Sequence, residues 1–496
     1  MPAECQDERT VFGSEQAGAR LQDTKAGEVN TMDSLTVEQT TLIAVNRREY
    51  GNAFEFLTFP DPDQAAAAAA ERAELLAWLD GPAQFGYRGT KVDCRRLSPG
   101  CQACGAGSWA CLFVNGRCNC SCFYCPSPQD DAGPPVTNGL VFTAPEDFAA
   151  YVARFGFTGA SFSGGEPLLT PERTLAYLAA VRRHCGDGVH LWLYTNGTLL
   201  TADLCRQLRA EGLDEIRFDL GAVGYDLTKL RLAVGIIPTV TVEVPAVPEE
   251  EGLLRQKMGE MVAAGVDFLN LHQLRLTPHN LRHLAGRGYT FLHGEKVTVL
   301  ESELTALRLL RHALENGLGL PVNYCSFPYK RRFQHAGARR RGAATIRSGW
   351  EGLTEAGFLR TLTLSGAPET LAGQAAAFAA AGGAAGSWHR EPGDGKLHLS
   401  IELWPLVDRD RFGLAVRYSE AAVVQTPSYR APFEKLTLPS GASLYVERRP
   451  VSPLFELRPA EADAFGAALL TESGTDTIPP PLLPFERIPA GLADYF

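Results

Sequence analysis

Eight of the twelve cysteines of this 496-residue chain fall between Cys94 and Cys125. Three of them, Cys118, Cys122 and Cys125, are separated by three and then by two residues. Disulfide frameworks of secreted proteins are rarely packed so tightly inside a long chain, whereas thiolates are common metal ligands. The crowding therefore predicts a metal site, and the surrounding chain must fold so as to hold it.

The spacing of this triplet lets one loop wrap three irons of a [4Fe–4S] cluster. Because only three thiolates are supplied, the fourth iron stays open and can chelate the amino and carboxylate groups of S-adenosylmethionine (SAM). A zinc knuckle would fit an isolated triplet as well. The rest of the sequence has to separate these two interpretations.

Two further motifs follow the cysteines, each at the end of a predicted strand. Gly-Gly-Glu-Pro occupies 164–167, where the glycines allow close backbone approach to a ligand and Glu166 can accept a hydrogen bond. Alone, this motif could be a simple turn. Thr195 and Asn196 end the next predicted strand over the same face. Three motifs in this order, each one βα unit apart, favour one shared site.

Short apolar runs alternate with amphipathic segments over 93–341, which is typical of βα units around a parallel sheet. The predicted strands are 109–115, 160–163, 189–194, 215–220, 239–244 and 268–274. We expect an α/β fold, a partial (β/α)6 TIM-like barrel. In such barrels the chemistry collects on the loops that follow the strands.

The segments on either side of 93–341 lack this βα pattern. Residues 1–35 are polar and aperiodic, which predicts disorder. A small N-terminal appendage is expected over 36–92, with a strand or two within 40–60 and a helix over 65–78.

Gly-rich turns and alternating strands predict a separate C-terminal α+β domain over 342–496. Within it, 375–385 is close to low complexity, and 479–484 has the composition of a polyproline tail.

Charge and hydropathy limit the binding partners and the cellular location to be expected. The 57 acidic and 47 basic residues give a net charge of −10, which argues against broad nucleic-acid binding. No apolar run is long enough to span a bilayer, and the N-terminus lacks the pattern of a signal peptide. We therefore expect a cytoplasmic protein that binds no membrane, in a compartment that keeps thiols reduced.

The three motifs together resemble those of the radical SAM superfamily. The resemblance implies that Gly164, Gly165 and Glu166 bind the amino group of the methionine, and that Tyr124 lies near the adenine. It places a further set at strand ends, where they could touch the ribose or carboxylate: Thr195, Asn196, Arg217 and Asp219. The alternative for Arg217 and Asp219 is an ion pair inside the barrel.

A narrower resemblance runs over 97–341, to uncharacterised radical SAM proteins, common in archaea, related to the pyruvate formate-lyase-activating enzyme. It depends on Pro-Gly-Cys-Gln-Ala-Cys at 99–104, on 266–271, and on Tyr324-Cys325-Ser326 followed by Tyr-Lys at 329–330. It implies a fold and a cofactor, but no substrate.

The upstream cysteines suggest a second site. Cys94, Cys101, Cys104 and Cys111 could supply four thiolates to a second iron–sulfur cluster or to zinc. Cys101 and Cys104 have the usual two-residue spacing, and the narrower family shares this pair together with Cys325. We expect Cys101, Cys104 and Cys325 to share an auxiliary site, with Cys111, Cys94 or an exogenous group as fourth ligand. Reduced free thiols are the alternative.

A basic run over 330–341 could bind phosphate or carboxylate groups of a substrate, although a solvated helix face is the commoner explanation. No catalytic residue is singled out by the sequence.

The expected function is reductive cleavage of SAM to a 5′-deoxyadenosyl radical that abstracts hydrogen from a peptide, a protein or a small molecule. The electron donor would be a flavodoxin or ferredoxin. The competing hypothesis is a non-catalytic zinc or iron–sulfur binding or assembly protein, which would have no need for the motif at 164–167.

Overall fold

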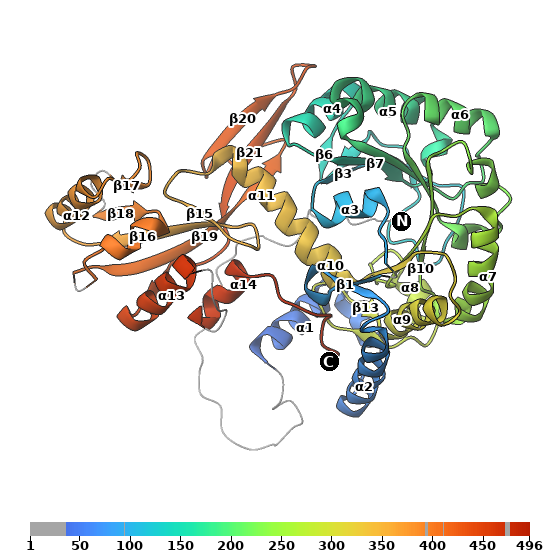
Figure 1. Ribbon diagram of the computed structural model, residues 1–496, viewed down its shortest axis with the longest axis horizontal. Coiled ribbons are helices and arrows are strands. Elements are labelled where there is room, and N and C mark those ends of the chain that lie inside the picture. The colour runs from blue at the N-terminus through green and yellow to red at the C-terminus, as the bar shows by residue number, and fades with distance from the viewer. Residues whose placement is uncertain (1–35, 94, 392–394, 410, 472–476) are drawn as a thin grey trace.

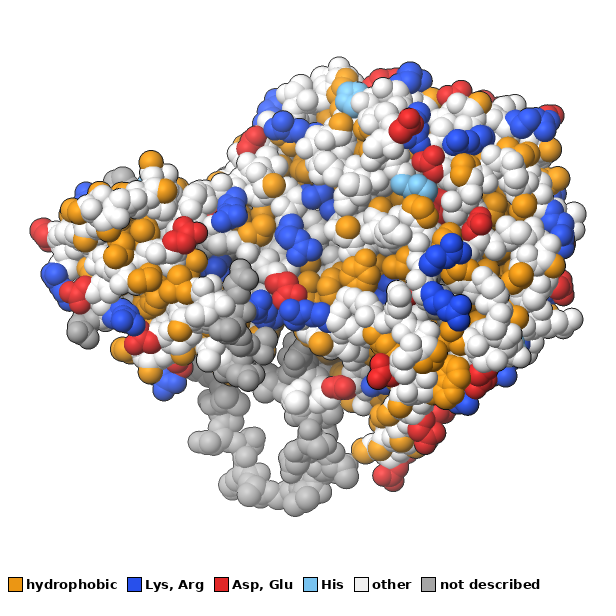
Figure 2. Space-filling model, in the orientation of Figure 1, with side chains coloured by type: hydrophobic (Ala, Val, Ile, Leu, Met, Phe, Trp, Pro, Cys, Tyr) orange, Lys and Arg blue, Asp and Glu red, His pale blue; other side chains and the backbone are white. Residues whose placement is uncertain are grey.

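The computed structural model describes residues 36–93, 95–391, 395–409, 411–471 and 477–496 (Figure 1). The predicted disorder of 1–35 and the possible ligand Cys94 lie outside these ranges. No helix of the described chain is both long and apolar enough to cross a membrane. Acidic and basic side chains are interspersed on the face shown in Figure 2.

A parallel sheet forms the larger part of the molecule, and each strand pairs with the next along the chain. Its strands are β3 (Trp109–Arg117), β7 (Gly159–Gly164), β8 (His190–Thr195), β9 (Glu215–Phe218), β10 (Thr239–Pro245), β11 (Phe268–His272) and β14 (Val322–Cys325). The α/β class predicted from the sequence is confirmed. All six predicted strands are present, and β14 adds a seventh to the parallel set in the described chain.

Helices connect these strands and cover one face of the sheet, which curves inside the ring of helices in Figure 1. They are α4 (Pro145–Arg154), α5 (Pro171–Cys185), α6 (Ala202–Ala210), α7 (Glu251–Ala264) and α9 (Leu300–Glu315). Successive side chains of a strand face opposite sides, so Ile216 and Phe218 of β9 join the apolar core beneath the helices. Glu215 and Arg217 consequently face the inside of the ring.

Short strands extend both edges of the sheet. At the β14 edge, β2 (Lys91–Asp93) pairs antiparallel with β14 and with β1 (Gln84–Gly86). At the β3 edge lie β4 (Asp130–Asp131), β5 (Val136–Thr137) and β6 (Leu140–Val141). A separate hairpin of β12 (Phe291–Leu292) and β13 (Thr298–Val299) follows the short helix α8 (Leu281–Ala285).

Helix α3 (Pro99–Gly105) lies within the ring of strands (Figure 1). Ser98 caps its first turn by accepting a hydrogen bond from the Cys101 amide at 3.2 Å. Gly159 of β7 leaves room for the helix, because a Cβ there would come within 2.8 Å of Ala103 Cβ. Cys101 and Cys104 are thus carried into the interior of the fold.

The strands predicted within 40–60 are wrong, because this segment is helical: α1 (Val37–Tyr50) and a 3-10 helix, η3 (Gly51–Phe56). Thr36 and Gln39 form a reciprocal capping box that begins α1. Ile43 and Tyr50 are spaced so that they share the face that packs into a small apolar cluster. The predicted helix over 65–78 is confirmed as α2 (Pro62–Leu79).

The C-terminal part is an antiparallel sheet with helices beside it (Figure 1). Its strands are β15 (Gly352–Leu353), β16 (Leu359–Ser365), β17 (Trp388–Arg390), β18 (Lys396–Leu399), β19 (Gly413–Val424), β20 (Phe433–Thr437), β21 (Ser443–Pro450) and β22 (Phe455–Leu457). Helices α12 (Pro368–Ala380) and α13 (Pro459–Thr471) accompany it. The expected boundary at 341–342 falls inside helix α11 (His335–Ile346), which packs on β19.

The polyproline tail expected over 479–484 is also wrong. A 3-10 turn, η13 (Pro480–Leu482), continues into α14 (Leu483–Glu486), since proline is tolerated in a first helical turn. The buried Glu486 pairs with Arg360 at 2.6 Å and accepts a hydrogen bond from the Tyr418 hydroxyl at 2.6 Å. These buried contacts hold the segment against the C-terminal sheet.

The basic run 330–341 spans a π-helical turn, η10 (Lys330–Gln334), which follows α10 (Phe327–Tyr329), and the first half of α11. It is not a fully solvated face, because its arginines are half-buried and three of them, Arg332, Arg339 and Arg340, donate to backbone carbonyls. Arg332 donates to Gly491 O at 3.0 Å, and Arg339 to Ala356 O at 2.8 Å. The run therefore joins α11 to the C-terminal segments.

Candidate functional site

A hollow of about 280 Å³, including its open mouth, lies where β3, β8 and β9 end. It is lined by Cys118, Cys120, Cys122, Tyr124, Cys125, Gln129, Asn196, Asp219 and Ala222. The three predicted cluster ligands thus share one cavity at the carboxyl ends of parallel strands, where α/β folds place their chemistry.

Backbone contacts fix the loop that carries these cysteines. The Cys125 amide donates to Cys122 O at 3.0 Å, and the Cys118 amide donates to Gln129 O at 3.1 Å. Farther along the chain, Asn280 Nδ2 donates to Tyr124 O at 3.2 Å. The loop is therefore held from both sides.

The donor set fits an iron–sulfur cluster better than a single ion. Nowhere in the described chain do three His, Cys, Asp or Glu side chains meet closely enough to hold one ion. Thiolates that bind separate corners of a cubane have no need to meet at one point. Burial raises the pKa of Cys122 to about 12, so a bound cation is needed to hold this thiol ionised.

Two glycines bring the predicted motif against the end of β3. A Cβ on Gly164 would lie 2.1 Å from Asn115 O, and one on Gly165 would lie 1.9 Å from Arg117 O. This close approach lets the Gly165 amide donate to Asn115 O at 2.8 Å and the Glu166 amide to Arg117 O at 2.6 Å. The motif is thereby anchored directly before the cysteine loop.

The Glu166 side chain is fully buried and joins β7 to β8. Its carboxylate accepts hydrogen bonds from Leu168 N at 2.9 Å, Thr195 Oγ1 at 2.9 Å and Asn196 N at 2.7 Å. Burial raises the pKa of Glu166 to about 7, although these hydrogen bonds act in the opposite sense. In this structure Glu166 therefore links parts of the chain to one another. Its binding of the methionine amino group of SAM remains a prediction.

Asn196, whose amide binds the Glu166 carboxylate, also contacts the cysteine loop through its side chain. Its Nδ2 donates to Asn119 Oδ1 at 2.8 Å and lies 3.7 Å from Cys118 Sγ. Across the cavity, the Tyr124 hydroxyl donates to Asp219 Oδ1 at 2.8 Å, and burial raises the pKa of Asp219. Tyr124, Asn196 and Asp219 therefore border the same cavity as the cysteines.

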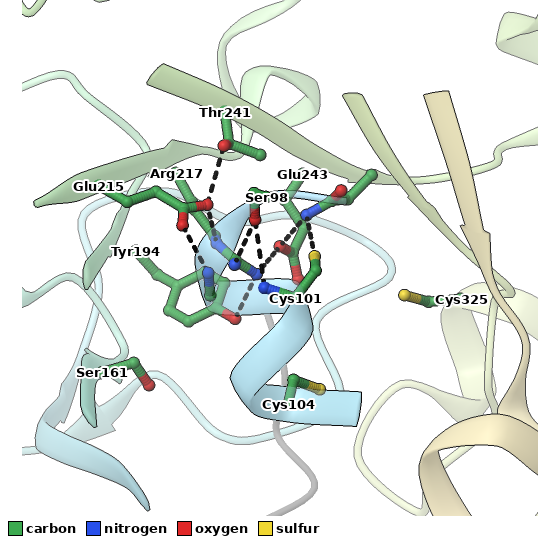
Figure 3. A network of polar contacts seen from close by, with 12 residues as sticks. Ser98, Cys101, Cys104, Ser161, Tyr194, Glu215, Arg217, Thr241, Glu243 and Cys325 are labelled. Atoms are coloured by element: carbon green, nitrogen blue, oxygen red, sulfur yellow. Dashed lines mark hydrogen bonds and ion pairs between the residues drawn. The ribbon is translucent and has the colours of Figure 1, made fainter. Parts of the chain in front are cut away.

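Arg217 does not line this cavity. Its guanidinium is buried and pairs with Glu215 and Glu243, each at 2.7 Å, and donates to Ser98 Oγ at 3.1 Å (Figure 3). The ion pair considered between Arg217 and Asp219 is therefore wrong. Burial alone would raise the pKa of Glu215, but Arg217 and His190 hold it at about 2. This network fixes β9 and β10 to the start of α3.

Sequence reasoning missed Gln129 and Cys120, which line the cavity. Cys120 lies inside the cysteine motif, so its proximity could have been anticipated, whereas Gln129 carries no signal of its own. His272, which the motifs did not single out, is buried and lies 2.6 Å from Glu243 through its Nε2.

Comparison with known proteins agrees with this geometry. Residues 112–235 match the model of the radical SAM superfamily. The chain is 29% identical over 276 residues to a Methanocaldococcus jannaschii protein named "Putative glycyl-radical enzyme activating enzyme", covering 53% of this chain and 72% of that protein. It is 37% identical over 119 residues to the GTP 3′,8-cyclase of a Synechococcus strain, covering 22% of this chain and 33% of the cyclase.

Among solved structures, the radical SAM methyltransferase TsrM of Kitasatospora setae is 17% identical, with a TM-score of 0.27 over 38% of this chain and 42% of that one. The fold and the family match together define a radical SAM domain. The protein is a radical SAM enzyme whose cofactors are a [4Fe–4S] cluster and SAM.

Proposed function

We propose that this enzyme cleaves SAM reductively at a cluster held by Cys118, Cys122 and Cys125, and abstracts hydrogen from a protein, peptide or small-molecule substrate. The observation that carries the proposal is the single cavity shared by these thiols and the ends of β8 and β9. When bound, the cluster and SAM would supply the electron and the 5′-deoxyadenosyl radical. The electron donor would be a flavodoxin or ferredoxin.

The residues around the cavity would orient the SAM molecule. Tyr124 is kept in place by its bond to Asp219, so its ring can border the adenine, and Asp219 lies beside it on the cavity wall. Gly164, Gly165, Glu166 and Thr195 would shape the methionine end from the strand ends beside the cysteine loop. Arg217 would act indirectly, by holding β9 against α3.

We further propose that the curved parallel sheet is an open barrel that shields the radical. Its inner face carries Arg217, Glu243, Asn270 and His272, all buried. A face of buried side chains keeps water and competing hydrogen donors away from a reactive intermediate. The names of the relatives point to two kinds of substrate, a protein for the activating enzyme and a nucleotide for the cyclase.

The competing hypothesis is a non-catalytic metal carrier. A carrier requires thiolates but has no need for a glycine–glutamate segment pinned against the cysteine loop through Asn115 and Arg117. The anchored segment and the family match both favour the enzyme.

The test is anaerobic reconstitution with iron and sulfide, followed by dithionite reduction with SAM and quantification of 5′-deoxyadenosine. The wild type is expected to form it, and a variant with Cys118, Cys122 and Cys125 all changed to Ala is expected to form none. Cys205→Ala, in helix α6, is the matched control and should keep wild-type turnover. Intact SAM in the wild-type reaction would contradict the proposal.

A further inference from the structure

Three cysteines outside the SAM cavity gather inside the ring of strands. Cys101 and Cys104 lie one turn apart on α3, so they project from one side of the helix. Cys325 ends β14, and Figure 3 shows its sulfur directed towards the side of α3 that carries these two cysteines. Cys101 and Cys325 are buried, and Cys104 is half-buried.

Each of these sulfurs receives a hydrogen-bond donor from a different part of the chain. Asn270 Nδ2 lies 3.3 Å from Cys101 Sγ, and Gln334 Nε2 lies 2.8 Å from Cys104 Sγ. Lys91 Nζ lies 2.8 Å from Cys325 Sγ. A neutral thiol is a weak acceptor, whereas donors around metal-bound thiolates stabilise their charge and orient them. Once a metal is bound, these three donors would stabilise the sulfurs as thiolates; without it, Cys325 Sγ donates to Asn323 Oδ1 at 3.3 Å as a thiol.

The charge of Lys91 supports the same conclusion. Its side chain is fully buried, and its ammonium donates to Asn323 Oδ1 at 2.7 Å and lies 4.5 Å from the centre of the Tyr329 ring. In the part of the chain that the structure describes, no carboxylate forms an ion pair with it within 4 Å. A buried cation is stable only when anionic or polar groups surround it. Its charge interacts with the three cysteines and also with Asp93, a buried carboxyl group on the same strand β2.

We propose that Cys101, Cys104 and Cys325 bind a second iron–sulfur cluster, and that Lys91 balances its charge. Three thiolates around a dipositive core leave one net negative charge, which a single ammonium neutralises. A single zinc ion fits less well, because the described side chains nowhere converge on one point as an ion requires. Cys111 lies on β3, at the other end of the parallel sheet from Cys325.

The variant with Cys118, Cys122 and Cys125 changed to Ala tests this site without altering it. After anaerobic reconstitution it should keep about half of the wild-type iron and sulfide and a cluster signal by Mössbauer spectroscopy. Adding Cys101→Ala and Cys104→Ala should remove the remaining iron, whereas adding Cys205→Ala should not. Loss of all iron in the first variant, or zinc in place of iron, would overturn the proposal.

A second variant keeps every thiol. Lys91→Met preserves the length of the side chain and removes its charge, so iron content should stay and the midpoint potential of the second cluster should become more negative. An unchanged potential would contradict the role of Lys91. Because 5′-deoxyadenosine formation reports on the first cluster and iron retention in the triple variant on the second, the two proposals fail separately.

Discussion

Gly165→Ala tests whether the contact between the glycine motif and β3 holds the site together. The new Cβ would lie 1.9 Å from Arg117 O and 2.3 Å from its carbonyl carbon, so the backbone has to move apart. That movement breaks or stretches two hydrogen bonds, Gly165 N to Asn115 O and Glu166 N to Arg117 O. At about 0.5–1.5 kcal/mol each, their loss lowers the free energy of unfolding by about 1–3 kcal/mol.

The assay is chemical or thermal unfolding, read together with iron content after reconstitution. Gly188→Ala is the matched control, because nothing lies within 4 Å of its added Cβ and its backbone also has no positive φ. We expect the control to stay within about 0.5 kcal/mol of wild type. Equal stability and equal iron content in the two variants would refute the reasoning.

Three other changes give distinct signatures. Tyr124→Phe removes the 2.8 Å bond to the buried Asp219, so SAM binding by calorimetry should weaken by about 5–100-fold, and unchanged affinity would exclude the orienting role. Because burial raises the pKa of Glu166 from 4.5 to about 7, the folded state binds its proton more tightly than the unfolded one. Stability should therefore fall by about 3 kcal/mol as pH rises from about 4.5 to about 7, and in Glu166→Gln this part of the pH profile should be absent. Arg217→Met leaves the carboxylate of Glu243 buried without its cation and should cost about 3–5 kcal/mol in urea unfolding; a loss below 1 kcal/mol would contradict the network.

Short sequence patterns predicted the cysteine loop and the six strands, because these depend on residues close together in the chain. The spacing of Cys118, Cys122 and Cys125 placed them in one loop, and the motifs at strand ends placed Asn196 beside them. Strand β14 (Val322–Cys325) was not among the predicted strands. The helix α1 was mistaken for strands because its Val, Thr and Ile residues favour strands, whereas its capping box favours a helix.

Contacts between distant residues were beyond the reach of such patterns. Arg217 was predicted to contact SAM because it lies near a strand end. In the structure it forms an ion pair with Glu243, 26 positions later. Lys91 shows no signal in the sequence, and its meeting with Cys325 spans 234 positions. Both contacts follow from strand pairing, of β9 with β10 and of β2 with β14, which no local spacing encodes.

The most direct test of the central claim is the electron paramagnetic resonance spectrum of the reduced cluster, recorded with and without SAM. A variant with Cys101, Cys104 and Cys325 changed to Ala removes any contribution from the proposed second cluster. SAM that binds the open iron at Cys118, Cys122 and Cys125 is expected to shift the spectrum of that single cluster. A cluster spectrum that SAM leaves unchanged would contradict the account.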